Sequence, residues 1–261
     1  GLEGSTPIVD HHGGAVPCAH GLRSRVVRPF AEVPYQEAEM ALKPALQPLA
    51  ARAATRMLRA PGITVFVVFM ALASLWSAIT PLYGAPDEPA HVIRAASVVR
   101  GQLLGGERRG TASLQVSVPA FLAASGRDDC FAFRPVVPAS CMHLGGKFHG
   151  DRRLLTSAGR HPPAYYAIVG LPSLVARSNL GVWLMRFLSA ALCAALVALA
   201  VSTARRYLQG TLATLGIVVA VTPMLFFLAG VVNPSGLEIA AAVAAWVAAL
   251  AVASRSDDRI D

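Results

Sequence analysis

An unbroken uncharged stretch, residues 60–86, constrains this chain more than any other feature of its sequence. About 20 consecutive apolar residues are enough to cross the hydrocarbon core of a bilayer as a helix. The segment 63–83 is therefore predicted to be a transmembrane helix. Three further apolar runs predict spans at about 182–203, 212–232 and 236–253. These runs exclude a soluble basic binding module.

The composition supports the same class. Hydrophobic residues make up 54% of the chain and charged residues only 15%, whereas soluble domains carry about 25% charged residues. The formal net charge is +8, but the basic residues cluster between the apolar runs, which favours topology signals over a nucleic-acid surface. We expect an all-α, polytopic protein of the cell membrane, with the lipid bilayer and no nucleic acid as its partner.

The domain organisation follows from these runs. Residues 1–59 are rich in Pro, Gly and Ala and are predicted to be a disordered or poorly ordered leader, with Met40 and Met57 as plausible starts. The membrane domain is expected at 60–253 and a tail at 254–261. Within a large, partly helical loop at 84–178, residues 163–176 are too few to span and suit an interfacial helix. We expect the N-terminal part of a larger membrane domain; a complete four-helix protein is the alternative.

The basic residues beside the spans predict the orientation. If residues 163–176 do not cross, three basic groups fall on one side, which the positive-inside rule makes cytoplasmic. The N-terminus and the tail are then cytoplasmic and the loop 84–178 is extracytoplasmic. Loops longer than about 60 residues escape the rule, so the basic excess of this loop is acceptable. If residues 163–176 did cross, the second group would move outside. The groups are Arg52/Arg56/Arg59, Arg205/Arg206 and Arg255/Arg259.

The first candidate site is the sequence PDEPAH at residues 86–91. Asp87 suits a helix N-cap, and apolar residues then recur at helical spacing until Gly101. Asp87 and His91 are four residues apart and could share a helix face. Such a pair could act as a general base or help to hold a divalent metal ion. The alternative is structural: a capping Asp87, a first-turn Glu88 that favours the helix dipole, and a solvated His91.

The second candidate is HPPAYY at residues 161–166. Two prolines fix the start of a helix, and His161 would lie at the bilayer surface, where it could meet a phosphate or a sugar. The alternative is a capping turn with a tyrosine anchor.

The remaining candidates lie near the other spans. Pro223 should kink the third span, and Asn233 and Glu238 should lie close to the outer surface, where a carboxylate at the edge of a span is a functional candidate; a tight turn is the alternative. Arg186 either snorkels to the headgroups or anchors a lipid phosphate.

The cysteines give one further expectation. Cys130 and Cys141 share the long loop and could form a disulfide in an oxidising compartment; two free thiols are the alternative. Cys18 lies in the leader and Cys193 in an apolar run. The absence of a CxxC motif argues against a metal knuckle.

The order of these motifs resembles a known family. A span followed by DEPAH, a long loop, HPPAYY, an Arg-led span, Thr222-Pro-Met and NPSGLE is similar to the uncharacterised bacterial multi-pass membrane proteins of domain of unknown function 2142. The resemblance covers residues 60–253. That family looks like a branch of the GT-C superfamily of glycosyltransferases, whose members usually have more spans than the four expected here.

The resemblance implies a function. GT-C enzymes transfer a sugar from a polyprenyl-phosphate carrier to an acceptor outside the cytoplasmic membrane. Carried over to this chain, the catalytic carboxylates would be Asp87 and Glu88. The resemblance also extends to His161, in the loop element before the next span. From their positions beside the spans, we predict that His91, Arg186, Asn233 and Glu238 bind the substrate together with it. Asp87 and His91 would be the contacts for a divalent metal ion, if the reaction uses one. The competing hypothesis is a non-catalytic membrane protein, such as a transporter subunit or an envelope assembly factor.

Overall fold

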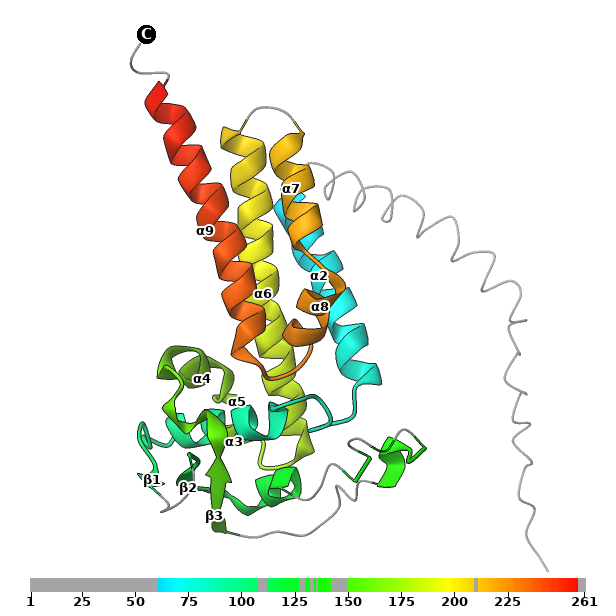
Figure 1. Ribbon diagram of the computed structural model, residues 1–261, viewed down its shortest axis with the longest axis vertical. Helices are drawn as coiled ribbons and strands as arrows, with labels where there is room; N and C mark the ends of the chain where they lie inside the picture. Colours follow the sequence, from blue (N-terminus) through cyan, green and yellow to red (C-terminus); the bar gives the residue numbers. More distant parts are fainter. Residues whose placement is uncertain are drawn as a thin grey trace, which may run out of the picture. The chain divides into compact units, whose positions relative to one another are not determined.

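The computed structural model describes residues 61–107, 112–126, 130–131, 134, 136–141, 150–208 and 211–257. The leader expected at 1–59 and residues 258–261 of the expected tail lie outside these residues. The described part is mostly helical, and it forms a bundle of long apolar helices with a smaller layer across one end (Figure 1).

Three helices of the bundle are long and apolar enough to cross a membrane. They are α2 (Pro61–Ile79), α6 (Asn179–Tyr207) and α9 (Pro234–Asp257). A fourth span is completed if α7 (Leu212–Ala220) and α8 (Pro223–Ala229) count together, although they meet at a bend of 59°. The four spans expected from the sequence therefore correspond to these helices. Pro223 begins α8, as expected of a residue that cannot continue a helix.

Small side chains hold the bundle together. Ala73, Ala190, Ala194, Ala229 and Ala240 are buried in one core shared by α2, α6, α8 and α9. In lipid, such residues allow helix backbones to approach closely and gain van der Waals contact.

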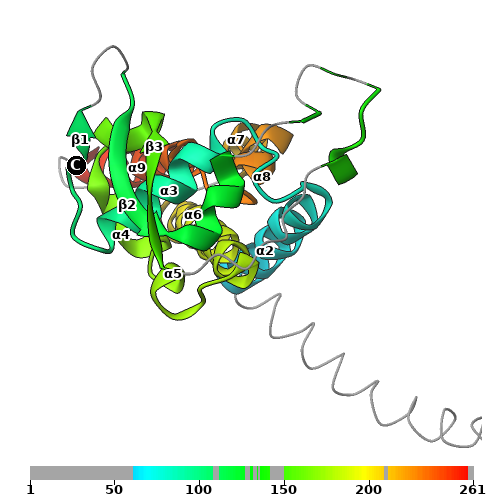
Figure 2. The same ribbon diagram turned by 90° about the horizontal axis from the view of Figure 1, so that it is seen from below.

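The layer across the end of the bundle is built around α3 (Glu88–Val98). Figure 2 shows α3 from this end, beside the sheet and α4. The short helices α4 (Pro163–Val169) and α5 (Pro172–Val175) complete the layer, so residues 163–176 do not form a span of their own. We call this the α3 end of the bundle.

A three-stranded antiparallel sheet covers α3, which differs from the all-α class expected from the sequence. The strands β1 (Gly106–Glu107), β2 (Leu114–Pro119) and β3 (Asp151–Thr156) pair in the order β1-β2-β3. Leu114 pairs with Thr156, and Pro119 with Asp151. The physical reason is the alternation in β2, whose Leu114, Val116 and Val118 are buried, with Val116 and Val118 in one core with α3 and Leu122.

Side chains fix α3 between its neighbours. The amide of Gln102 donates to the Ser117 carbonyl at 2.6 Å and accepts from the Ser117 N–H at 2.7 Å. Arg100 donates to the carbonyl of Ser173 at 2.7 Å. The C-terminal end of α3 is thus tied both to β2 and to α5.

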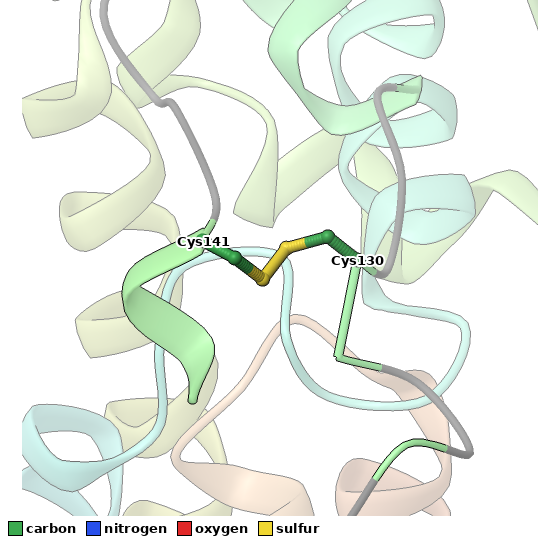
Figure 3. The surroundings of a disulfide bond; sticks show 2 residues. All are labelled: Cys130 and Cys141. Carbon is green, nitrogen blue, oxygen red and sulfur yellow. A yellow bond between two sulfur atoms is a disulfide. The ribbon is translucent and has the colours of Figure 1, made fainter. Parts of the chain in front are cut away.

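A disulfide joins Cys130 and Cys141 in the loop between β2 and β3 (Figure 3). Their Cα atoms lie 6.2 Å apart, and Cys141 ends the short 3-10 helix Ala139–Cys141. Cys193 is buried in the bundle as a free thiol.

Candidate functional site

The PDEPAH sequence lies where the end of α2 turns into α3. Helix α2 ends at Ile79, shortly before Pro81, and α3 begins at Glu88 with Pro89 in its first turn. Most of α3 is buried, because the bundle packs on one side of it and the sheet on the other. Polar side chains on α3 must therefore find partners within the protein.

Glu88 and Arg186 form an ion pair in the interior of the protein. Arg186 Nε and Nη2 donate to the two carboxylate oxygens of Glu88, each at 2.6 Å. Both side chains are fully buried. A bidentate contact of this kind is the strongest geometry available to a guanidinium and a carboxylate. Residues far apart in the sequence are thereby joined, one on α3 and the other near the start of α6.

The other donors of Arg186 are also satisfied inside the protein. Nη1 donates to the carbonyls of Ser77 and Thr80, and Nη2 donates to that of Pro81, at 2.7–3.0 Å. A guanidinium has five N–H groups, so Arg186 retains none for a lipid phosphate and does not snorkel. From the sequence, Arg186 was expected either to snorkel to the headgroups or to bind a lipid phosphate. The structure differs from both expectations, because Arg186 caps the carbonyl groups at the C-terminal end of α2.

Glu88 has a further contact on its inner side. Its Oε1 also accepts the backbone N–H of Val232, at 3.2 Å, from the link between α8 and α9. Glu88 therefore connects α3 with α6 and with the link between α8 and α9, and it presents no oxygen to solvent. The contacts of Glu88 fit a residue that positions α3, whereas the family resemblance implied that Glu88 is a catalytic carboxylate.

Asp87 is exposed beside this buried pair. Its backbone lies in the left-handed region, with φ of 60°, and its side chain makes no capping hydrogen bond to α3. Asp tolerates this region better than most residues, yet it remains uncommon and tends to mark functional sites. Asp87 therefore precedes α3, as expected, but its carboxylate remains available to solvent.

His91 lies one turn into α3 and is buried, whereas the sequence allowed for a solvated ring. Its Nδ1 is 2.8 Å from the hydroxyl of Tyr166, and its ring centroid is 5.6 Å from that of His161. Burial and the neighbouring His161 lower the pKa of His91 from 6.5 to about 4, against a smaller opposite effect of Asp87. His91 is thus neutral at physiological pH.

His161 joins the two candidate motifs. Its side chain is exposed at the start of α4, while its carbonyl accepts a hydrogen bond from Arg94 Nη2 at 3.0 Å. The structure thereby brings His91, His161 and Tyr166 into one cluster, although they come from α3 and from the turn into α4.

Arg94 belongs to the same cluster and was missed by the sequence analysis. It is 2% exposed, its Nη1 donates to the carbonyl of Leu103 at 2.9 Å, and its guanidinium lies 5.9 Å from the centre of the Tyr166 ring. Its Nε has no hydrogen-bond partner, and no carboxylate pairs with it in the part of the chain that the structure describes. Burial lowers the pKa of Arg94. The signal was its spacing, three residues after His91 on a helix.

Asn233 and Glu238 lie at the start of α9. The Asn233 side chain accepts the N–H of Ser235 at 2.9 Å, which stabilises the first turn of α9. Glu238 is exposed, and its charge raises the pKa of Tyr166, although burial of the tyrosine contributes more. Glu238 thus has an exposed carboxylate, whereas the Asn233 side chain oxygen accepts a backbone N–H.

The described residues contain no group of three or more His, Cys, Asp or Glu side chains that could hold a metal ion. One ring nitrogen of His91 lies on the Tyr166 hydroxyl. The metal contacts expected at Asp87 and His91 stay a prediction.

The fold and the cluster at the α3 end define a multi-pass helical protein of the lipid bilayer, with a polar site at one end of its bundle. The family described as "Predicted membrane protein (DUF2142)" matches residues 69–260. The chain belongs to this family. Neither the curated proteins nor the solved structures contain a match.

Proposed function

We propose that this chain carries the acceptor-activating site of a membrane glycosyltransferase, which moves a sugar from a polyprenyl-phosphate carrier to a cell-envelope acceptor on the extracytoplasmic face. The observation that carries the proposal is Asp87. It is an exposed carboxylate without a capping bond, held in a left-handed backbone conformation beside a rigidly anchored helix. A general base needs this combination of access and fixed position.

The neighbouring side chains supply complementary roles in the proposal. Asp87 would take the proton from the acceptor hydroxyl or orient that hydroxyl. The exposed His161 could donate a hydrogen bond to the departing phosphate, and the buried Arg94 would add positive potential next to it. Glu88 and Arg186 would hold α3 in place without touching the substrate, and Glu238 would face the acceptor side of the cluster.

The proposed orientation places the α3 end outside the cytoplasm. Arg205 and Arg206 lie in the last turn of α6, at the opposite end of the bundle (Figure 1). By the positive-inside rule this opposite end would face the cytoplasm. The disulfide between Cys130 and Cys141 lies in the loop between β2 and β3, and an oxidising compartment favours such a bond.

The test is the Asp87→Asn substitution in the protein expressed in its own cell envelope. Loss of a general base lowers the rate by about 10²–10⁴-fold, so we expect transfer of a labelled sugar from the polyprenyl-phosphate pool to fall by that amount at unchanged membrane abundance. Glu107→Gln is the control, because Glu107 is exposed in the same layer and pairs with the exposed Arg160. Unchanged envelope glycans in the Asp87 variant would exclude the enzyme.

One observation favours the second candidate, a transporter subunit. The α7–α8 pair is bent by 59°, and transporters often form their binding sites with broken helices near the bilayer midplane. If this candidate is correct, Asp87→Asn leaves sugar transfer intact, and substitutions at the Thr222–Pro223 break abolish uptake instead.

A further inference from the structure

We propose that the end of the bundle opposite α3 binds an anionic diacyl phospholipid, with its acyl chains between α7 and α9 and its phosphate at Arg205 and Arg206. This inference is independent of sugar transfer, because the two sites lie at opposite ends of the bundle. It rests on two adjoining hollows, of which one has an apolar lining and the other is lined in part by arginine and threonine side chains.

The first hollow is an apolar groove of about 1150 Å³ between α7 and α9, and its lining includes Tyr207 and Leu208. Leu212, Trp246 and Leu250 are 81%, 72% and 54% exposed in its wall. Among the residues that the structure describes, no charged side chain lines it. Gly216 opens it further, since a Cβ atom added there would meet nothing within 4 Å. The groove therefore has the volume and polarity that suit hydrocarbon chains.

The second hollow, of about 730 Å³, lies at the junction of α6 and α7. Arg205 and Arg206 line it together with the hydroxyl-bearing Thr211 and Thr214, and its lining in the described part of the chain contains no carboxylate. The Arg206 guanidinium lies 5.4 Å from the centre of the Tyr207 ring. Guanidinium groups bind phosphate oxygens in pairs of hydrogen bonds, and the threonine hydroxyls offer further donors. This wall is complementary to a phosphodiester.

The two hollows adjoin, because Tyr207 and Leu208 line both. An apolar groove that opens beside two arginines at the end of a bundle is complementary to an amphiphile with a negative head. Basic pockets between transmembrane helices bind anionic headgroups in this way. A protein helix could fill the groove, but an apolar helix would leave the charges of Arg205 and Arg206 in the adjoining hollow without a counter-charge. The charge of that hollow therefore selects the lipid.

The experiment uses Trp246 as the reporter. In the full chain carrying Trp76→Phe and Trp183→Phe, Trp246 is the remaining tryptophan, and acyl chains brominated along their length quench it on contact. The protein is reconstituted in phosphatidylcholine vesicles that contain brominated phosphatidylglycerol or, in parallel, the same fraction of brominated phosphatidylcholine. Two arginines favour an anionic headgroup by roughly tenfold to thirtyfold, so we expect quenching at a correspondingly lower fraction of phosphatidylglycerol.

Three variants locate the site. Arg205→Gln with Arg206→Gln should remove the headgroup preference, and both changes are on exposed side chains. Gly216→Phe should remove it by filling the groove. Val219→Phe is the matched control, because Val219 is 78% exposed on the same helix but does not line the groove; it should leave the preference intact.

Each other outcome overturns the proposal. Equal quenching by the two lipids, or a preference that survives loss of both arginines, would show ordinary annular lipid. Protection of Trp246 from both lipids would show a protein segment in the groove. Displacement by unlabelled undecaprenyl phosphate at concentrations where phosphatidylglycerol is ineffective would show an isoprenoid site instead.

Discussion

The buried pair of Glu88 and Arg186 dominates the energetics at the residue scale. Removing one partner of such a pair leaves an uncompensated charge in a medium of low dielectric constant, which costs about 3–5 kcal/mol. We therefore expect Glu88→Gln to lower the free energy of unfolding by about that amount. Thermal unfolding in detergent micelles measures the change.

The exposed pair of Arg160 and Glu107 is the matched control. Its side chains are 61% and 80% exposed, and exposed pairs contribute at most about 1 kcal/mol. Glu107→Gln should therefore leave the unfolding transition nearly unchanged. If the two variants were equally stable, Glu88 would not anchor α3 as the structure indicates.

His91 makes stability depend on pH. The unfolded chain takes up a proton at His91 near pH 6.5, but the folded protein does so only near pH 4, because the ring is buried and His161 is close. The stabilisation is fully present above pH 6.5 and is lost as the pH falls through about 4. We expect a loss of up to about 3 kcal/mol over this interval.

His91→Gln isolates this effect. Glutamine can still bond to the Tyr166 hydroxyl but does not titrate, and Asp87 and His161 remain beside it. The difference in unfolding midpoint between wild type and variant should therefore shrink from pH 7 to pH 4. A constant difference would show that His91 is solvated, which was the alternative expected from the sequence.

At the scale of elements, close backbone contacts join α4 to α3. A Cβ atom added at Gly170 would clash with the carbonyl of Ala95 on α3. Inserting a methyl group into such a contact costs about 1–3 kcal/mol, so we expect Gly170→Ala to destabilise the α3 end. Gly216→Ala is the control, since its added methyl group meets open space. Equal unfolding midpoints for the two variants would contradict this packing.

The bundle was predictable from the sequence because lipid imposes one simple rule, a long apolar run. Even Pro223 could be recognised as a break, since proline lacks the N–H that a helix needs. The sheet was missed because its signal is short. Only Leu114, Val116 and Val118 alternate, and the partner strand β3 reads as a charged loop until it is paired.

The candidate site was predictable in part. Asp87 and His91 were found by their helical spacing, and His161 by its prolines. The contacts of Glu88 with Arg186 and of His91 with Tyr166 join residues far apart in the chain, and no local pattern reveals them. The sequence therefore indicated where polar groups gather, but not which of them are buried.

At the scale of the whole molecule, the proposed sugar transfer requires that the α3 end faces away from the cytoplasm. Leu104 at this end and Leu212 at the opposite end are suitable reporters, because they are 80% and 81% exposed. Each is replaced by cysteine in a background of Cys18→Ser and Cys193→Ser, with the disulfide retained. A membrane-impermeant maleimide is then added to intact cells.

We expect Leu104→Cys to be labelled in intact cells and Leu212→Cys only after the membrane is permeabilised. The opposite pattern would place Asp87 on the cytoplasmic face and contradict the proposed transfer of a sugar outside the membrane.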